Sequence, residues 1–196
     1  NTLTDNTSGN NNTAVGRQSL TDNTTGTSNT AVGSLSLFTN STGVSNSAVG
    51  VHALRTNNGN DNSALGHSAL RLNTSGSNNT AIGVESLRSN TTASNNTAVG
   101  RSSLEDNTTG TENVAVGAYS LDANTTGSQN NAVGYTALSA NTTGINNDAF
   151  GHASMLSNTT GSYNIAMGRA SLDANTSGFH NIALGPFALT SNTTAA

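Results

Sequence analysis

The chain contains no cysteine, no tryptophan and a single proline, and only 8% of its residues are charged. Without cysteine, a disulfide scaffold and thiolate chemistry are excluded. All six basic residues are arginines, and the net charge of −4 provides no basic patch for nucleic acid. No apolar run approaches the ~20 residues of a membrane helix, and no signal-peptide pattern is visible. We therefore expect no nucleic-acid partner and no membrane insertion.

Large apolar side chains are also scarce, since 32% of the residues are hydrophobic and 4% are aromatic. This composition disfavours a conventional globular core. Low hydrophobicity is typical of disorder, but disorder driven by charge needs a high net charge, which this chain lacks. Most of the remaining residues are Asn, Thr, Ser, Ala and Gly. Interactions other than large apolar packing must therefore hold the chain together.

The sequence is a tandem repeat. An apolar residue followed by glycine recurs every 17 residues from Gly16 to Gly185, with one step of 16 where Asn57-Asn58-Gly59 replaces the usual Asn-Thr-Thr-Gly. We number the places of each unit from the residue after this glycine, so the glycine itself is place seventeen. The chain is thus a single repeat domain, 1–196, which we interpret as a piece of a longer array. Complete units are 17–33, 34–50, 51–66, 67–83, 84–100, 101–117, 118–134, 135–151, 152–168 and 169–185, and partial units are 1–16 and 186–196.

Several places hold nearly the same residue in every unit. Place four is leucine or methionine, places seven and thirteen are asparagine, place fifteen is alanine and place sixteen is apolar. Place ten is glycine, with Ala93 and Ala195 as exceptions. The asparagines expected to form ladders are Asn23, Asn40, Asn57, Asn73, Asn90, Asn107, Asn124, Asn141, Asn158 and Asn175 at place seven, and Asn29, Asn46, Asn62, Asn79, Asn96, Asn113, Asn130, Asn147, Asn164 and Asn181 at place thirteen. The apolar stripes are Leu20, Leu37, Leu54, Leu70, Leu87, Leu104, Leu121, Leu138, Met155 and Leu172 at place four, and Val15, Val32, Val49, Leu65, Ile82, Val99, Val116, Val133, Phe150, Met167 and Leu184 at place sixteen.

This pattern predicts an all-β fold, a parallel β-solenoid (β-roll) of ~11.5 coils with two short strands per coil. A 17-residue unit is too short for a helical hairpin repeat, and its apolar places do not follow a helical period. Coils ~4.8 Å apart would give a rod ~55 Å long. Each Asn would lie above an identical Asn, so the side-chain amides can hydrogen-bond in ladders. Glycine at places ten and seventeen is expected to allow positive φ where the chain turns.

Neighbouring residues in a strand point to opposite faces, yet places three and four are both uncharged and small or apolar, as are places fifteen and sixteen. Both faces of each strand are therefore expected to be buried. One interpretation puts the small Ser and Ala side chains in the lumen. The Leu and Val stripes would then form an exposed apolar patch through which identical chains associate side by side. The opposite assignment, with large residues inside and Ala and Ser outside, stays open.

Units such as Asn12-Thr-Ala-Val-Gly16 and Asn79-Thr-Ala-Ile-Gly83 resemble the Asn-x-x-Ala-Ile-Gly head repeats of trimeric autotransporter adhesins. With Asn-Thr-Thr-Gly included, the pattern is similar to the repeat arrays of bacterial and phage tail-fibre-domain proteins, which often precede a self-cleaving chaperone of the endosialidase type. The resemblance covers essentially the whole chain, although adhesin heads use shorter units. It implies a left-handed parallel β-roll that forms a homotrimer.

No enzyme signature is visible, and we expect neither catalytic residues nor a cofactor nor a metal site. The four histidines and ten acidic residues are dispersed over the unit, with no acid pair fixed for glycoside hydrolysis. Arg55, Arg71 and Arg88 share place five of successive units and form a candidate anion-binding row, against the alternative of an ordinary solvated edge. The place-seven asparagines begin Asn-x-Ser/Thr sequons, but an amide needed for a ladder cannot carry a glycan.

The favoured function is an extracellular structural or adhesive fibre segment, located at a cell surface or on a virion. It would act as a rigid multivalent scaffold, because repetition lets weak contacts add up. Expected partners are other copies of the chain, as a homotrimer or an end-to-end filament, and a host or cell-surface glycan. Ice binding by rows of threonine is the alternative. A depolymerase on a phage fibre is a third hypothesis, for which these residues offer no acid pair.

Overall fold

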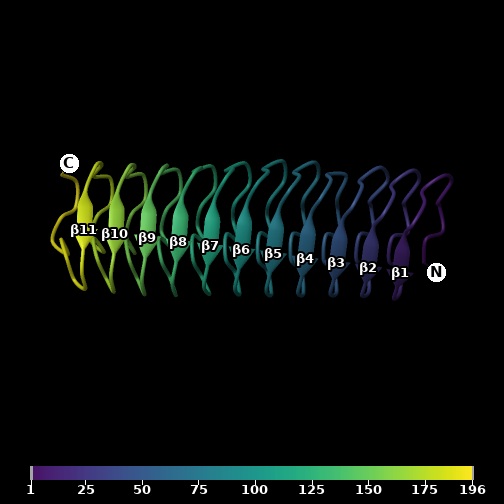
Figure 1. Cartoon of the computed structure of the whole chain (residues 1–196), viewed down its shortest axis with the longest axis horizontal. Helices are drawn as coiled ribbons and strands as arrows, with labels where there is room; N and C mark the ends of the chain where they lie inside the picture. Colours follow the sequence, from purple (N-terminus) through teal and green to yellow (C-terminus); the bar gives the residue numbers. More distant parts are fainter. Residues whose placement is uncertain (1, 196) are drawn as a thin grey trace.

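A computed structural model describes residues 2–195, and in it each coil contributes one three-residue strand to a single parallel sheet (Figure 1). The sheet has 11 strands in sequence order, so every strand pairs with those of the preceding and following coils. At a spacing of ~4.8 Å, the ten steps from the first strand to the last span ~48 Å. The predicted parallel β-solenoid is confirmed. The strands are β1 (Thr13–Val15), β2 (Thr30–Val32), β3 (Ser47–Val49), β4 (Ser63–Leu65), β5 (Thr80–Ile82), β6 (Thr97–Val99), β7 (Val114–Val116), β8 (Asn131–Val133), β9 (Asp148–Phe150), β10 (Ile165–Met167) and β11 (Ile182–Leu184).

Each strand occupies places fourteen to sixteen, and each residue pairs with the same place of the next coil. This register also holds across the 16-residue unit, where Ser47 pairs with Ser63. The coil is one residue shorter at the corner formed by Asn57-Asn58-Gly59, and the hydrogen bonds change there. In the usual coil the place-eight carbonyl accepts the backbone N–H of the coil before it, as Ser41 does from Thr24 at 3.0 Å. In the short unit the side-chain oxygen of Asn58 accepts the Ser41 N–H instead, at 2.9 Å.

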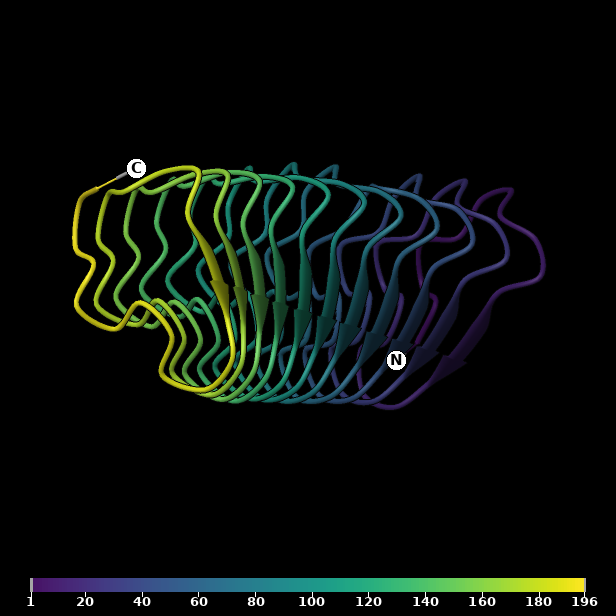
Figure 2. The ribbon, with the colours of Figure 1, turned by 60° about the vertical axis from the view of Figure 1, so that its left-hand side comes forward.

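The second predicted strand, at places one to six, is wrong: these residues form turns, apart from one isolated bridge between Thr39 and Thr56, and Figure 2 shows a single row of strand arrows. Its residues at places two and four have left-handed backbones, for example Ser102 with φ 52° and Leu104 with φ 51°. A left-handed residue other than glycine costs roughly 1–2 kcal/mol. Backbone bonds between coils offset this cost, since the Leu104 N–H donates to the Ser120 carbonyl at 3.0 Å. The turns of successive coils therefore stack as a ladder, as the strands do.

The sequence left two arrangements open, with either the small or the large residues inside, and the structure follows neither. Leucine at place four and alanine at place fifteen are both fully buried, as Leu104 and Ala98 illustrate with 0% exposure, while the place-sixteen residues lie outside. In the strand, alternation turns alanine inward and its apolar neighbour outward. In the turn segment the left-handed residues break alternation, so Ser103 and Leu104 both reach the interior. The Leu stripe is the core of the rod and the Val stripe is its surface.

Glycine is favoured at places ten and seventeen for two different physical reasons. Place seventeen has φ between 110° and 143°, as predicted. The glycines at place ten do not have positive φ, so the prediction of a left-handed backbone at this place is wrong. A Cβ on Gly26 would lie only 2.5 Å from the Gly43 carbonyl oxygen of the next coil, so close approach of the coils selects glycine there. Ala93 shows that one methyl group can be accommodated, since Asn90 still donates to its carbonyl at 3.0 Å.

Candidate functional site

The place-seven asparagines form the first of two buried side-chain ladders. The Asn124 Nδ2 group donates to Oδ1 of Asn107 in the preceding coil and to the Gly127 carbonyl of its own coil, both at 2.9 Å. Its own Oδ1 accepts from Asn141 of the next coil at 2.9 Å. Both side-chain hydrogens are thus used, and the residue is fully buried. An amide in this position has no room for a glycan in the folded coil.

The place-thirteen asparagines form a second ladder that shares acceptors with the first. Asn113 Nδ2 donates to Asn96 Oδ1 at 3.2 Å and to the Gly127 carbonyl at 2.9 Å. The Gly127 carbonyl therefore accepts from Asn124 and Asn113 together. Because this pattern recurs along the rod, each place-ten carbonyl joins two neighbouring coils. The predicted Asn ladders are confirmed, and the shared acceptor explains why both places are invariant along the chain.

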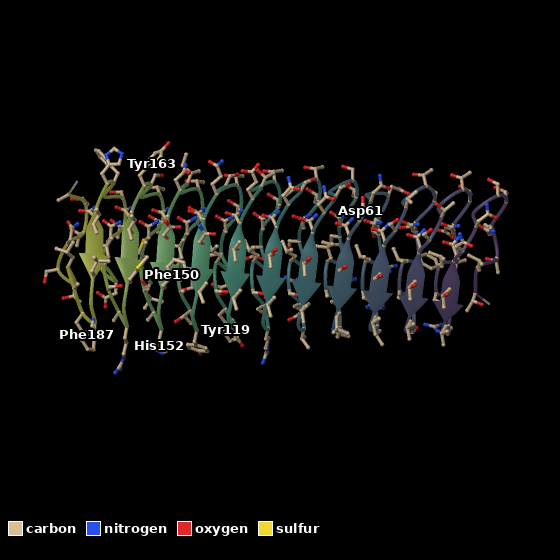
Figure 3. All side chains as sticks on the ribbon, viewed as in Figure 1. Asp61, Tyr119, Phe150, His152, Tyr163 and Phe187 are labelled. Carbon is tan, nitrogen blue, oxygen red and sulfur yellow. The ribbon has the colours of Figure 1, made fainter. Side chains whose placement is uncertain are left out.

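The place-sixteen side chains form an exposed apolar stripe along the outer face of the sheet, where Phe150 is visible in Figure 3. Val116 is 36% exposed, and Leu184 near the end of the rod is 64% exposed. The stripe has one member in every strand from β1 to β11. Contiguous exposed apolar surface of this kind is typical of an interaction surface.

The predicted arginine row is brought together on successive coils at place five. Arg88 donates to Glu105 at 2.8 Å in an ion pair, and Arg55 lies over the Phe38 ring at 5.9 Å from its centroid. The Nε atoms of Arg55, Arg71 and Arg88 are buried without a hydrogen-bond partner. Their chains are therefore packed along the rod instead of fully solvated. Anion binding by this row stays a prediction.

The row continues with carboxylates at Glu105 and Asp122, again at place five. Burial raises the pKa of the Asp122 carboxyl to about 6, opposed by its backbone hydrogen bonds and reinforced by the nearby charges of Asp106 and Glu105. One of its oxygens is buried without a partner. Asp122 thus carries a charge that the folded rod stabilises poorly.

A ridge of aromatic and basic side chains occupies places one and two in the C-terminal half. The Arg101 guanidinium lies 5.7 Å from the Tyr119 ring centroid, and Tyr119 contacts Tyr135 edge to face. Tyr135 in turn stacks on His152, with ring centroids 5.5 Å apart. Figure 3 places Tyr119 and His152 along one edge of the rod. His52 and His67 form a smaller pair, with centroids 6.0 Å apart.

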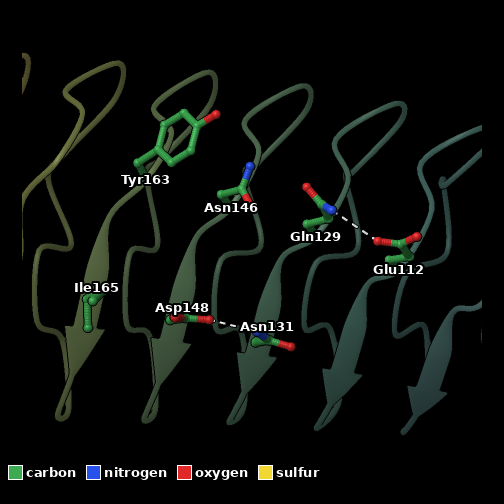
Figure 4. A pocket seen from close by; sticks show the side chains of 7 residues that line it. All are labelled: Glu112, Gln129, Asn131, Asn146, Asp148, Tyr163 and Ile165. Atoms are coloured by element: carbon green, nitrogen blue, oxygen red, sulfur yellow. Dashed lines mark hydrogen bonds between the residues drawn. The ribbon is translucent and has the colours of Figure 1, made fainter.

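An open groove of about 480 Å³ lies between the place-twelve corners and the place-fourteen strand residues (Figure 4). None of its residues was singled out as a site from the sequence. The sequence does change there: place twelve holds Asn, Ser or Asp through Asn95 and then Glu, Gln, Asn, Tyr and His, while place fourteen holds Thr or Ser through Thr97 and then other types. The lining residues are Glu112, Gln129, Asn131, Asn146, Asp148, Tyr163 and Ile165.

Within residues 2–195, no group of three or more His, Cys, Asp or Glu side chains is arranged to hold a metal ion. The same residues include no helix long and apolar enough to cross a membrane. No protein-family model, curated protein or solved structure matches the chain.

Proposed function

We propose that the chain is a segment of an extracellular structural or adhesive fibre that acts as a rigid scaffold for repeated display. The observation that carries this proposal is the pair of interlocked Asn ladders, exemplified by the Gly127 carbonyl that binds both Asn113 and Asn124. Buried, fully satisfied polar networks rigidify a structure. Apart from the apolar place sixteen, most outward-facing places vary from unit to unit, since the asparagines and the buried Leu and Ala places lie inside. A stiff rod with a variable surface is what multivalent binding needs.

The same proposal includes association of identical chains along the place-sixteen stripe, as a homotrimer or in a filament. Burying apolar surface is favourable by roughly 25 cal/mol per Å², and the stripe extends over the full sheet. Ile82 and Val116 are 39% and 36% exposed, and within residues 2–195 no other strand covers this face of the sheet. A second copy presents the same stripe at the same spacing, so in-register pairing would cover both. A glycan on a host or cell surface is the proposed target of the assembled fibre.

The absence of cysteine makes this association easy to test. A Val99→Cys variant carries its thiol on the stripe, and a Thr109→Cys control carries it on an exposed corner outside the strand. With a thiol-specific cross-linker, we expect dimers and trimers from Val99→Cys and mostly single chains from Thr109→Cys. If both variants yield only single chains, lateral association along the stripe is wrong.

Ice binding is the alternative, favoured by one observation. Place nine presents an exposed row that includes Thr92, Thr109 and Thr126, one per coil. The neighbouring place-eight hydroxyls are occupied, because Thr108 Oγ1 donates to the Thr125 carbonyl at 3.0 Å. Of these two rows, only the place-nine threonines therefore offer free hydroxyls, and this single row lies at a corner of the coil. Thermal hysteresis, measured at high protein concentration, tests this alternative. Activity in the wild type that is lost in Thr109→Val would support ice binding, and a wild type without activity would rule it out.

A further inference from the structure

The groove of Figure 4 is built from two rows of side chains, one at the corners and one on the strands. Glu112, Gln129, Asn146 and Tyr163 come from four successive corners, and Asn131, Asp148 and Ile165 come from strands β8, β9 and β10. The groove follows the rod axis over three coil spacings, or ~14 Å. Its volume of about 480 Å³ falls within the range of ligand pockets, roughly 300–1,000 Å³.

The corner row is held rigidly by the backbone. The Tyr163 N–H donates to the Ile145 carbonyl at 3.0 Å, and the Gln129 N–H donates to the Thr111 carbonyl at 3.0 Å. Each side chain therefore starts from a fixed backbone position, one coil from the next. Ligand binding therefore need not order the backbone of this row, and only its side chains lose freedom.

The groove is rich in paired donors and acceptors. Gln129 Nε2 donates to Glu112 Oε2 at 3.0 Å, and Asn131 Nδ2 donates to Asp148 Oδ1 at 2.7 Å (Figure 4). Each amide keeps its oxygen and a second N–H, and each carboxylate keeps a second oxygen. Sugar hydroxyls, which donate and accept together, match such amide–carboxylate pairs.

One end of the groove is aromatic. Tyr163 is 50% exposed, and its ring centroid lies 5.3 Å from that of His180 in the next coil. Phe179 extends this cluster, with its ring 5.4 Å from His180. An exposed tyrosine offers an apolar face beside a polar tip, which suits a pyranose ring with its own apolar face. Ile165 adds apolar surface below.

Charge restricts the class of sugar. Glu112 and Asp148 both line the groove, and no arginine or histidine is among its lining residues. Carboxylated or sulfated sugars would be repelled by these two side chains. We infer that the groove binds a neutral oligosaccharide lying along the rod axis. This inference deepens the proposed adhesive function by giving the glycan target a class and a site, and it does not depend on lateral association.

The test is calorimetric titration of the purified chain with neutral tetrasaccharides of glucose, mannose, galactose and N-acetylglucosamine, and with acidic tetragalacturonate. We expect at least one neutral probe to bind with a Kd of ~1 mM or tighter and tetragalacturonate not to bind. Tyr163→Ala and Asp148→Ala should each weaken binding ~10-fold. The matched control Thr80→Ala, at place fourteen in the N-terminal half, should leave it unchanged. Circular dichroism checks that each variant stays folded.

Three outcomes would overturn the inference: no neutral probe binds at ~10 mM, tetragalacturonate binds better, or Tyr163→Ala and Thr80→Ala behave alike. Sedimentation of the same sample separates this result from the fibre proposal. Chains that associate but bind no neutral probe refute the site alone. Chains that bind through Tyr163 but stay single refute only the lateral assembly.

Discussion

Replacing one asparagine in the middle of the rod should destabilise it far more than the loss of a surface amide. In Asn113→Ala the side chain no longer accepts the backbone N–H of Asn130 at 3.0 Å or its Nδ2 group at 3.2 Å. Asn130 is fully buried, so its backbone N–H and one N–H of its Nδ2 group lose their partner with no water to replace it, while the Nδ2 group keeps its bond to the Gly144 carbonyl at 2.8 Å. The Gly127 carbonyl keeps its bond from Asn124 at 2.9 Å and adds little to the cost.

The magnitude follows from those two orphaned donors. A buried unsatisfied donor costs about 1–3 kcal/mol, so we expect Asn113→Ala to lower the free energy of unfolding by about 4 kcal/mol. The control Asn131→Ala removes only a partly exposed bond to Asp148, at 2.7 Å, and should cost less than ~1 kcal/mol.

Urea denaturation followed by circular dichroism measures both variants. Hydrogen exchange adds local resolution, because coils contact only their neighbours and the weakened coil should open first. If Asn113→Ala loses less than ~1 kcal/mol, or no more than Asn131→Ala, the ladders do not hold the rod together and the reasoning fails.

Three further changes test the core, the glycines and the charges. Leu104→Ala should cost about 2–5 kcal/mol in the same titration, because its side chain is fully buried; a cost under ~1 kcal/mol would refute the assigned core. Gly117→Ala should be less stable than Gly110→Ala: a Cβ at either position would crowd the next coil, but only Gly117 has a positive φ, 133°, and place ten already holds alanine at Ala93; equal stability would contradict this. In the folded rod the pKa of Asp122 is raised to about 6, above its ordinary value. Charging this carboxyl as the pH rises from ~4 through ~6 should therefore lower the free energy of unfolding, by about 1 kcal/mol after solvent screening. Melting across this pH range should show that loss in the wild type and not in Asp122→Asn.

The strand and both ladders were predictable from the sequence because they depend only on period. Identical residues at a fixed spacing must stack in register, so Asn113 lies between Asn96 and Asn130 whatever the shape of the coil. The strand at places fourteen to sixteen follows from the same period, whereas the second expected strand does not form. The glycine at place seventeen was also explained correctly, since its positive φ is a local property.

The turn segment was not predictable in the same way. Nothing in the type of Leu104 signals a left-handed backbone, which leucine ordinarily avoids, and only stacking on Ser120 makes it acceptable. The inward direction of Leu104 depends on that backbone, so the sequence pattern could not decide which of the apolar stripes lies inside. The groove was not predictable for a related reason. That Tyr163 and Asp148 line the same groove follows only from the geometry of the corners.

The central claim is that this rod is a fibre segment whose chains associate along the place-sixteen stripe, and sedimentation equilibrium tests it most directly. A single chain has a mass of 19.6 kDa. We expect the wild type to sediment as a whole-number multiple of that mass, threefold for a homotrimer, and Val116→Asp with Val133→Asp to sediment as a folded single chain. A wild type that remains at the mass of one chain at every concentration, with its circular dichroism intact, would contradict the account.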